Sequence, residues 1–86
     1  MEKEIQILKA LAHPLRLDII KLLILNENLC VCKIQEAFNI GQSNLSQHLK
    51  IIKDAEILNS KKDGGWVYYS LKNKKITEIL DLLKQF

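Results

Sequence analysis

Apolar residues recur every three or four positions through the first third of the chain. The spacing of Ile5 and Leu8 predicts a helix over residues 2–12. Pro14 ends that helix, because the residue before a proline is pushed out of the α region. The same proline can open a second helix at its first turn. That second helix is expected to end at the polar residues 26–28.

A short helix around Ile34 and a longer helix over 42–55 are expected next, separated by a turn at 39–41. Glycine carries no steric cost at such a turn, so Gly41 is predicted as the N-cap of the longer helix. At 100° per residue one face of this helix is apolar and the other is polar. The apolar stripe consists of Leu45, Leu49 and Ile52.

Two β-rich runs, 57–62 and 66–71, flank the sequence Asp63-Gly64-Gly65. Glycines supply positive φ values, so this pattern predicts a β-hairpin. A last apolar stripe predicts a closing helix over 74–86. The fold class is therefore mostly α with a β-hairpin wing, in the order of four helices, a two-stranded hairpin and a final helix.

A chain of 86 residues and 9.9 kDa, 48% of it hydrophobic, is expected to fold as one domain, residues 1–86. A short helix, a turn and a second helix with a polar outer face make a helix-turn-helix, here over about 32–55. The hairpin at 57–71 adds a wing. The predicted architecture is a winged helix-turn-helix.

The apolar stripes of the first and last helices are wide for so small a chain. One domain of this size cannot easily bury both, and two-fold dimers are the commonest closed assembly. We therefore expect a homodimer in which the helices at 2–12 and 74–86 pack against their symmetry mates. The predicted contact residues are Ile5, Leu8, Ile79, Leu80, Leu83 and Phe86.

The excess positive charge lies in one part of the sequence. The chain carries +3 overall, while residues 42–75 hold seven lysines against three carboxylates, a net +4. Charge gathered on one segment is typical of a protein that docks on a polyanion with one surface. A solvated lysine-rich surface would explain the charge alone equally well.

The polar side chains of residues 42–50 suit the recognition of double-stranded DNA. Gln47 and Asn44 can hold adenine bidentately, serines can bond base edges or phosphate, and lysines can meet the backbone. Two more lysines precede the hairpin turn, where phosphates or the minor groove could be reached. The candidate DNA-binding residues are Gln42, Ser43, Asn44, Ser46, Gln47, Lys50, Lys61 and Lys62.

Two neighbouring features have an alternative interpretation. The aromatic residues within 66–69 could stack single-stranded bases. Alternation along a strand, however, turns either Trp66/Tyr68 or Val67/Tyr69 toward the domain, so packing explains them without a ligand. His48 lies between the apolar and polar faces of its helix and is expected to pack or bond phosphate rather than to bind a metal.

The two cysteines are expected to be reduced. The run 15–25 is interrupted by charges and cannot span a bilayer, and residues 1–4 do not begin a signal peptide, so a cytoplasmic location is expected. Cysteines there are more often thiols than structural disulfides. Cys30 and Cys32 are therefore predicted to be available to a metal or a redox signal.

Four segments match a known family in the same order: 11–17 (LAHPLRL), 29–32 (LCVC), 42–49 (QSNLSQHL) and 65–69 (GWVYY). Together they resemble the ArsR/SmtB family of metal-sensing repressors over nearly the whole chain. The resemblance implies a winged-helix homodimer that blocks a promoter when unliganded. It also implies an inducer whose binding releases the operator DNA.

The pair Cys30 and Cys32 bears on the identity of that inducer. Thiolates select thiophilic ions such as trivalent arsenic or antimony, cadmium, lead, zinc or monovalent copper. Both sulfurs can converge on one ion at a helix start. The pair resembles the cysteine box of the arsenic-responsive branch, which implies trivalent arsenic or antimony as the inducer. The alternative is two small buried apolar side chains.

Departures from the family pattern narrow the choice of inducer. Gln35 stands where some arsenic sensors have a third cysteine, so a third ligand would be solvent, a small thiol or nothing. No cysteine precedes Cys30, which disfavours cadmium and lead. The stretch that aligns with the zinc-sensing branches offers Asn73, Lys75 and Phe86 and no histidine. No zinc site is expected on the last helix.

The sequence thus predicts that arsenite or antimonite on the two cysteines moves residues 42–50 out of register with the DNA groove. A thiol-based redox or persulfide sensor, and a cadmium or lead sensor of the same fold, are alternatives. A constitutive DNA-architectural protein is an alternative of another class. No enzyme is expected, because nothing resembles a nucleophile and base pair or a phosphate loop.

Overall fold

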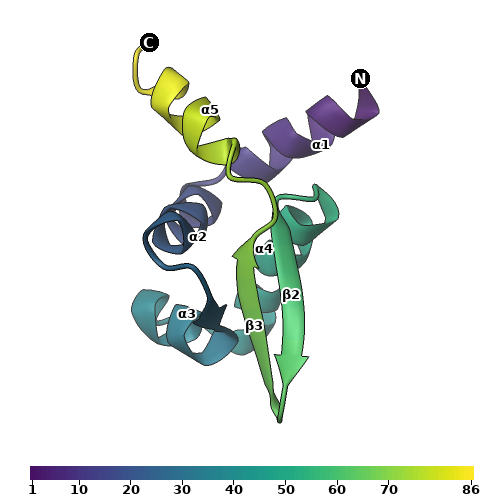
Figure 1. Cartoon of the computed structure of the whole chain (residues 1–86), viewed down its shortest axis with the longest axis vertical. Helices are drawn as coiled ribbons and strands as arrows, with labels where there is room; N and C mark the ends of the chain where they lie inside the picture. The colour runs from purple at the N-terminus through teal and green to yellow at the C-terminus, as the bar shows by residue number, and fades with distance from the viewer.

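A computed structural model describes residues 1–86 and has five helices and three strands. In chain order the elements are α1 (Glu2–Leu11), α2 (Pro14–Leu25), β1 (Leu29–Cys30), α3 (Val31–Phe38), α4 (Gln42–Asp54), β2 (Leu58–Asp63), β3 (Trp66–Leu71) and α5 (Ile76–Leu83). Figure 1 shows the hairpin at one end of the molecule and both chain termini at the other. The principal extents are 39 × 24 × 22 Å. The predicted fold class, mostly α with a hairpin wing, is confirmed.

The break between α1 and α2 forms as the sequence predicts. His13 is the extended N-cap of α2, and its Nδ1 atom accepts the backbone N–H of Leu15 at 3.1 Å. Pro14 occupies the first helical position, where its missing N–H leaves no backbone bond unmade. Helix α1 ends at Leu11, one residue before the expected boundary.

The turn between α3 and α4 takes its left-handed conformation at Asn39. Asn39, the C-cap of α3, has φ of 50°, and its N–H bonds to the carbonyl of Gln35. Gly41 is the N-cap of α4 as predicted, yet its φ is −63° and a Cβ there would meet no atom within 4 Å. The turn therefore depends on Asn39, and glycine is not required at position 41.

One apolar core joins the helices to the sheet. The stripe predicted for α4, Leu45, Leu49 and Ile52, is fully buried. These side chains belong to the same cluster as Ile19 and Ile20 of α2. Because side chains from three successive turns of α4 lie in this core, the packing of the whole domain fixes the orientation of α4.

The sheet has three strands in the order β1-β3-β2, whereas the sequence predicts a two-stranded hairpin. Strand β1 pairs antiparallel with β3 through Leu29 opposite Tyr69 and Cys30 opposite Tyr68. Two residues are too short to show an alternating pattern, which is why β1 was not expected. The hairpin turn itself is only Gly64 and Gly65, and Gly64 has φ of +64°.

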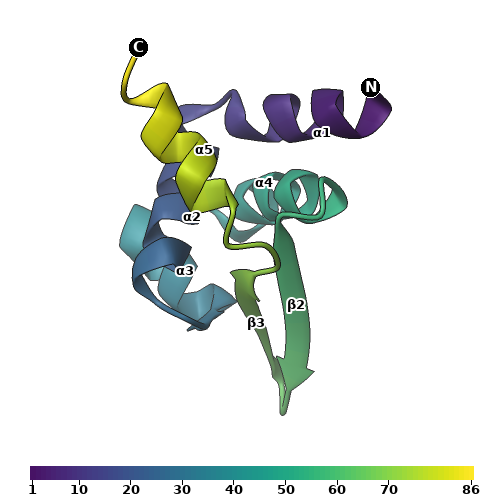
Figure 2. The ribbon, with the colours of Figure 1, turned by 45° about the horizontal axis from the view of Figure 1, so that its top comes forward.

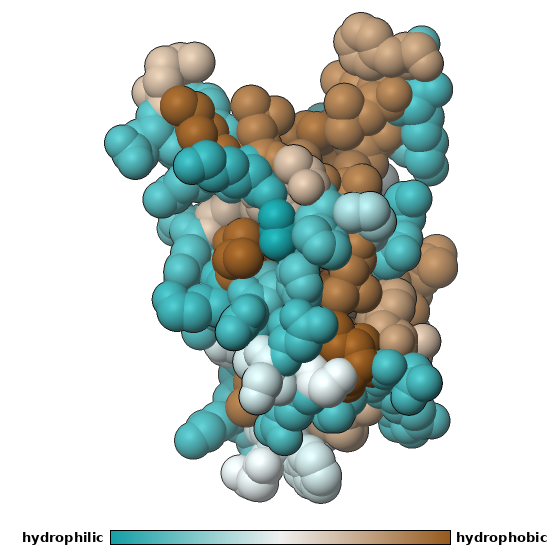
Figure 3. Space-filling view, turned by 180° about the vertical axis from the view of Figure 1, so that it is seen from behind, coloured by the Kyte–Doolittle hydropathy of each residue, from teal (hydrophilic) through white to brown (hydrophobic).

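The outer ends of the terminal helices α1 and α5 diverge, as Figure 2 shows, while both helices contribute residues to the core. Helix α5 covers Ile76–Leu83 and is shorter than the predicted 74–86. Seen from behind, apolar side chains gather over the end that carries the two termini (Figure 3). No helix in the structure combines the length and the apolar character that crossing a membrane requires.

Candidate DNA-reading surface and cysteine pair

The predicted DNA-reading residues of α4 form its solvent face. Six of them are exposed, namely Gln42, Ser43, Asn44, Ser46, Gln47 and Lys50. Lys50 Nζ lies 2.9 Å from Asp54 Oδ2 one turn later, and both side chains are exposed. An exposed pair of this kind contributes at most about 1 kcal/mol, so the ammonium group is free to exchange this carboxylate for a phosphate.

The two wing lysines lie on opposite faces of the hairpin. Lys61 is opposite Tyr68 in the ladder and Lys62 is opposite Val67. Consecutive residues of a strand alternate between faces. Both lysines are exposed.

A polar network behind α4 joins it to α1 and α2. Arg16 Nε and Nη2 donate to the carbonyls of Ala10 and Lys9 at 2.9 Å, capping the end of α1. Its Nη1 lies 3.2 Å from His48 Nδ1 on α4, and the His48 and His13 rings are 4.6 Å apart. Partial burial, followed by the nearby His13 and Arg16, lowers the pKa of His48. His48 is thus a packing residue, in agreement with the first of the two roles expected for it.

The cysteines occupy the junction between β1 and α3 and form a disulfide, whereas the sequence favours free thiols. Their Cα atoms are 5.2 Å apart, which is within the usual range for disulfides. Cys30 is the N-cap of α3, and its Sγ accepts the Cys32 N–H at 3.2 Å. The two sulfurs thus lie together at the start of α3.

The sulfur atoms of Cys30 and Cys32 suit a thiophilic ion that takes two protein ligands. Once the disulfide is reduced, Cys30 and Cys32 can present both thiolates to one centre. No group of three or more histidine, cysteine or acidic side chains is placed to hold a metal ion. The protein alone therefore offers two sulfur ligands at this position.

Residues 13–60 match the family model described as "Bacterial regulatory protein, arsR family". The chain belongs to the ArsR family. It is 39% identical over 84 residues to an uncharacterized HTH-type transcriptional regulator of Methanocaldococcus jannaschii, covering 98% of this chain and 94% of the relative. It is also 39% identical to the arsenical resistance operon repressor of Bacillus subtilis over 80 residues, which cover 93% and 76% of the two chains.

Solved structures of related regulators share the fold of this ArsR-family chain. HlyU from Vibrio cholerae matches with a TM-score of 0.84 and 31% identity, covering 98% of this chain and 90% of that one. The transcriptional repressor PagR of Bacillus anthracis matches with a TM-score of 0.80 and 35% identity, covering 95% and 93%. The winged helix-turn-helix and a role in DNA-binding transcription regulation follow, in a family of regulators rather than enzymes.

The exposed apolar surface of this ArsR-family chain comprises five of the six predicted dimer contacts. Ile5, Leu8, Ile79, Leu83 and Phe86 are exposed in the single chain, together with Met1 and Leu82. Leu80 is only 6% exposed and belongs to the chain's own core. It therefore holds α5 against the domain from the inside.

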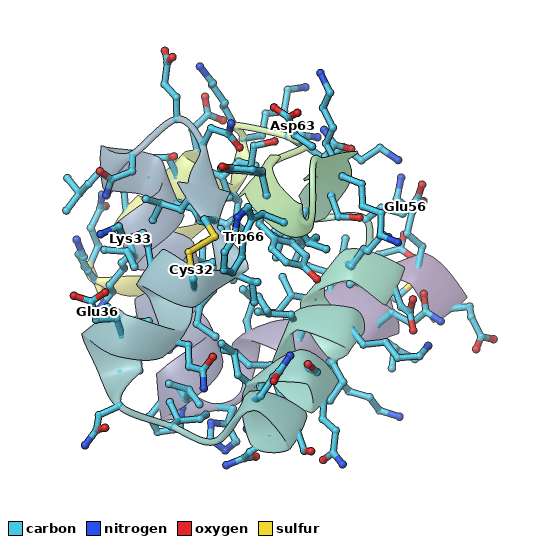
Figure 4. The ribbon with its side chains drawn as sticks, turned by 90° about the horizontal axis from the view of Figure 1, so that it is seen from below. Cys32, Lys33, Glu36, Glu56, Asp63 and Trp66 are labelled. Carbon is cyan, nitrogen blue, oxygen red and sulfur yellow. A yellow bond between two sulfur atoms is a disulfide. The ribbon has the colours of Figure 1, made fainter.

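Sequence reasoning missed Arg16 and the outer face of the sheet. Arg16 bonds to carbonyls six and seven residues earlier, a contact that no periodicity predicts. Tyr69 packs against the core and its pKa is raised by burial, so one aromatic pair does face the domain as expected. Trp66 and Tyr68 face away from it, beside the disulfide (Figure 4). An arginine soon after a helix break, and the alternation of residues 66–69, are the signals that could have indicated these contacts.

Proposed function

We propose that this chain is an operator-binding repressor that releases DNA when arsenite or antimonite binds the thiolates of Cys30 and Cys32. The observation that carries the proposal is the position of the cysteine pair. Cys30 ends a strand of the wing sheet, and Cys32 lies in the first turn of the helix before α4. A ligand there lies on β1, which pairs with strand β3 of the wing, and on α3, the helix directly before α4. The relatives named arsenical resistance operon repressor support the same choice of ligand.

DNA binding is assigned to a homodimer. The five exposed apolar residues of α1, α5 and the C-terminus face a second copy, while Leu80 supports α5 from within. Two copies of α4 then read the two halves of an operator, one helical turn of DNA apart. Gln47 and Asn44 contact base edges; the neighbouring contacts are Gln42, Ser43, Ser46, Lys50, Lys61 and Lys62.

Inducer binding requires the reduced pair. Two equivalents of a small thiol convert the disulfide to two thiols and leave as one small disulfide. Arsenite, As(OH)₃, then forms two sulfur–arsenic bonds, and the two thiol protons leave with two hydroxyl groups as two water molecules. The remaining hydroxyl is the third arsenic ligand, because the protein presents only two sulfurs here.

The signal reaches DNA through β1 and α3. Drawing the two sulfurs onto one centre changes the start of α3 and the pairing of Cys30 with Tyr68. A coupling of about 1–3 kcal/mol changes operator affinity roughly 5- to 150-fold. Two sites in a dimer increase the total effect.

Titration of a fluorescent operator with arsenite tests the proposal. The reduced protein should release DNA, while Cys30→Ser and Cys32→Ser should retain it. Gln35→Ser, on the same helix, serves as the control and should respond like the native chain. Gln35→Cys should respond at lower arsenite concentration because it can supply a third sulfur. Equal release of all four variants would contradict the assignment of the site.

A second titration series tests the DNA contacts. Gln47→Ala should relax specificity at one position of each half-site, because only base contacts carry sequence information. Lys61→Ala and Lys62→Ala should weaken binding to every sequence and reduce its salt dependence. Unchanged selectivity in Gln47→Ala would remove that residue from the reading surface.

Redox sensing is the second candidate, and the disulfide between Cys30 and Cys32 is the observation that favours it. In that case peroxide or a persulfide would change operator affinity, whereas arsenite would not. Cadmium and lead belong in the same series because one relative is the cadmium resistance regulatory protein CadC of Listeria innocua. A protein that binds DNA equally under all these conditions would be a constitutive architectural module.

A further inference from the structure

The disulfide borders a groove on the outer face of the wing sheet. A cavity of about 290 Å³ beside it is lined by Cys32, Trp66 and Tyr68. A second cavity of about 230 Å³ shares Asn28 and Tyr68 with the first and reaches Lys61. Figure 4 shows Trp66 next to the sulfur–sulfur bond. The two cavities share the lining residues Asn28 and Tyr68, and together they are called the groove below.

The register of the sheet determines how charge lies along this groove. Cys30, Tyr68 and Lys61 are direct neighbours across the three strands and share one face. Adjacent strands are about 4.8 Å apart, so the Lys61 backbone lies about 10 Å from that of Cys30. A molecule that binds both ends must therefore be small, carry a reactive sulfur and bear an anionic group.

The two sulfurs differ in ways that determine which one reacts. Both cysteines line the first cavity, but Cys30 is buried, with 7% of its surface exposed, whereas Cys32 is partly exposed. The Cys30 sulfur also accepts the backbone N–H of Cys32 at the start of α3. A hydrogen bond at a helix N-terminus stabilises a thiolate, so Cys30 is the better leaving group.

We propose that this groove binds carboxylate-bearing low-molecular-weight thiols and that Cys32 is their site of covalent attachment. The incoming thiolate attacks Sγ of Cys32, the Cys30–Cys32 bond breaks, and its electron pair leaves on Cys30 as a thiolate. One thiolate is consumed and one is released, so no oxidant or reductant is needed. The carboxylate of the bound thiol pairs with Lys61.

The other charges around the groove determine how strongly it should prefer an anionic thiol to a cationic one. Asp63 lies at the far end of the groove and opposes an anion. Lys33 also borders the cysteines, in an exposed pair with Glu36 at 4.0 Å on the same helix. Lys61 lies in the cross-strand row of Cys30 and Tyr68, so we take it as the cation that meets the ligand, and exposed charges of this kind change rates roughly two- to fivefold.

Exchange kinetics of single-cysteine variants test the proposal without operator DNA or arsenite, so the result is independent of the proposed function. Cys30→Ser retains a side-chain oxygen at the N-cap of α3 and leaves only Cys32. It is treated separately with the disulfides of 3-mercaptopropionate, 2-mercaptoethanol and cysteamine. Mass spectrometry follows the mixed disulfide, and the fluorescence of Trp66, the only tryptophan, follows occupation of the groove. We expect the anionic reagent to react roughly two to five times faster than the cationic one.

Matched variants locate the charge responsible. In the Cys30→Ser background, Lys61→Gln should abolish the anionic preference, Asp63→Asn should increase it, and Lys33→Gln should leave it unchanged. Cys32→Ser should react more slowly than Cys30→Ser with every reagent. In the native chain, acid quenching after addition of 3-mercaptopropionate should place the adduct on Cys32. Equal rates for the three reagents, loss of preference in Lys33→Gln alone, or an adduct on Cys30 would overturn the proposal.

Discussion

Helix α4 is anchored in the core along more of its length than the wing is. Leu45, Leu49 and Ile52 anchor α4 in the core over three turns, and Arg16 ties its back to α1. Beyond Ser60 the residues of β2 and the turn are all exposed, and the wing is anchored at its base by Leu58, Tyr69 and Leu71 and by the short pairing with β1. We therefore expect that the proposed ligand at the cysteines would displace the start of α3 and the wing tip more easily than it would rotate α4.

The largest effect expected from this difference is on stability. Leu49→Ala should lower the free energy of unfolding by about 2–5 kcal/mol, because it leaves a cavity at a fully buried position. Trp66→Ala removes a larger side chain from the wing but should cost only about 0.5 kcal/mol, since that residue is 56% exposed. Urea denaturation followed by circular dichroism measures both. Similar losses would show that the wing is as tightly anchored as α4.

A smaller loss of stability is expected when the contacts of Arg16 between α1 and α4 are removed. Arg16→Met removes two hydrogen bonds to backbone carbonyls and one contact with His48, so unfolding free energy should fall by about 1–3 kcal/mol. Arg16→Lys should restore less than half of the lost free energy. A single ammonium group cannot reach the three partners that the planar guanidinium group contacts. Full rescue by lysine would mean that charge alone matters.

The wing turn provides a matched pair of substitutions. Gly64 has φ of +64°, so Gly64→Ala should cost about 1–2 kcal/mol in the hairpin. Gly65→Ala should be nearly neutral, because its φ is not in the left-handed region and a Cβ there meets nothing within 4 Å. Hydrogen exchange of the wing amides would register the difference. Equal protection in the two variants would contradict the assigned turn geometry.

The same difference explains what the sequence could predict. The apolar residues of α4 repeat every three to four positions, so the apolar pattern predicts which of them lie in the core. The two-residue strand at Leu29 and Cys30 is too short to show an alternating pattern. The disulfide was not expected either, because compartment and composition favour thiols and say nothing about how closely two particular sulfurs approach. Features that depend on the register of the sheet, such as the row formed by Cys30, Tyr68 and Lys61, required the fold.

The smallest effect concerns pH and the back of α4. His48 has a lowered pKa, caused first by partial burial and then by His13 and Arg16, the groups that face it from α2 and the helix break before it. Because the folded pKa lies below the ordinary value of about 6.5, the unfolded chain binds more protons as the solution is acidified. The contribution of His48 to stability is present above the ordinary pKa and is lost as pH falls through the folded pKa. Denaturation midpoints measured between neutral and mildly acidic pH should therefore decline less in His48→Gln than in the native chain, and parallel declines would remove His48 as a source of the pH dependence.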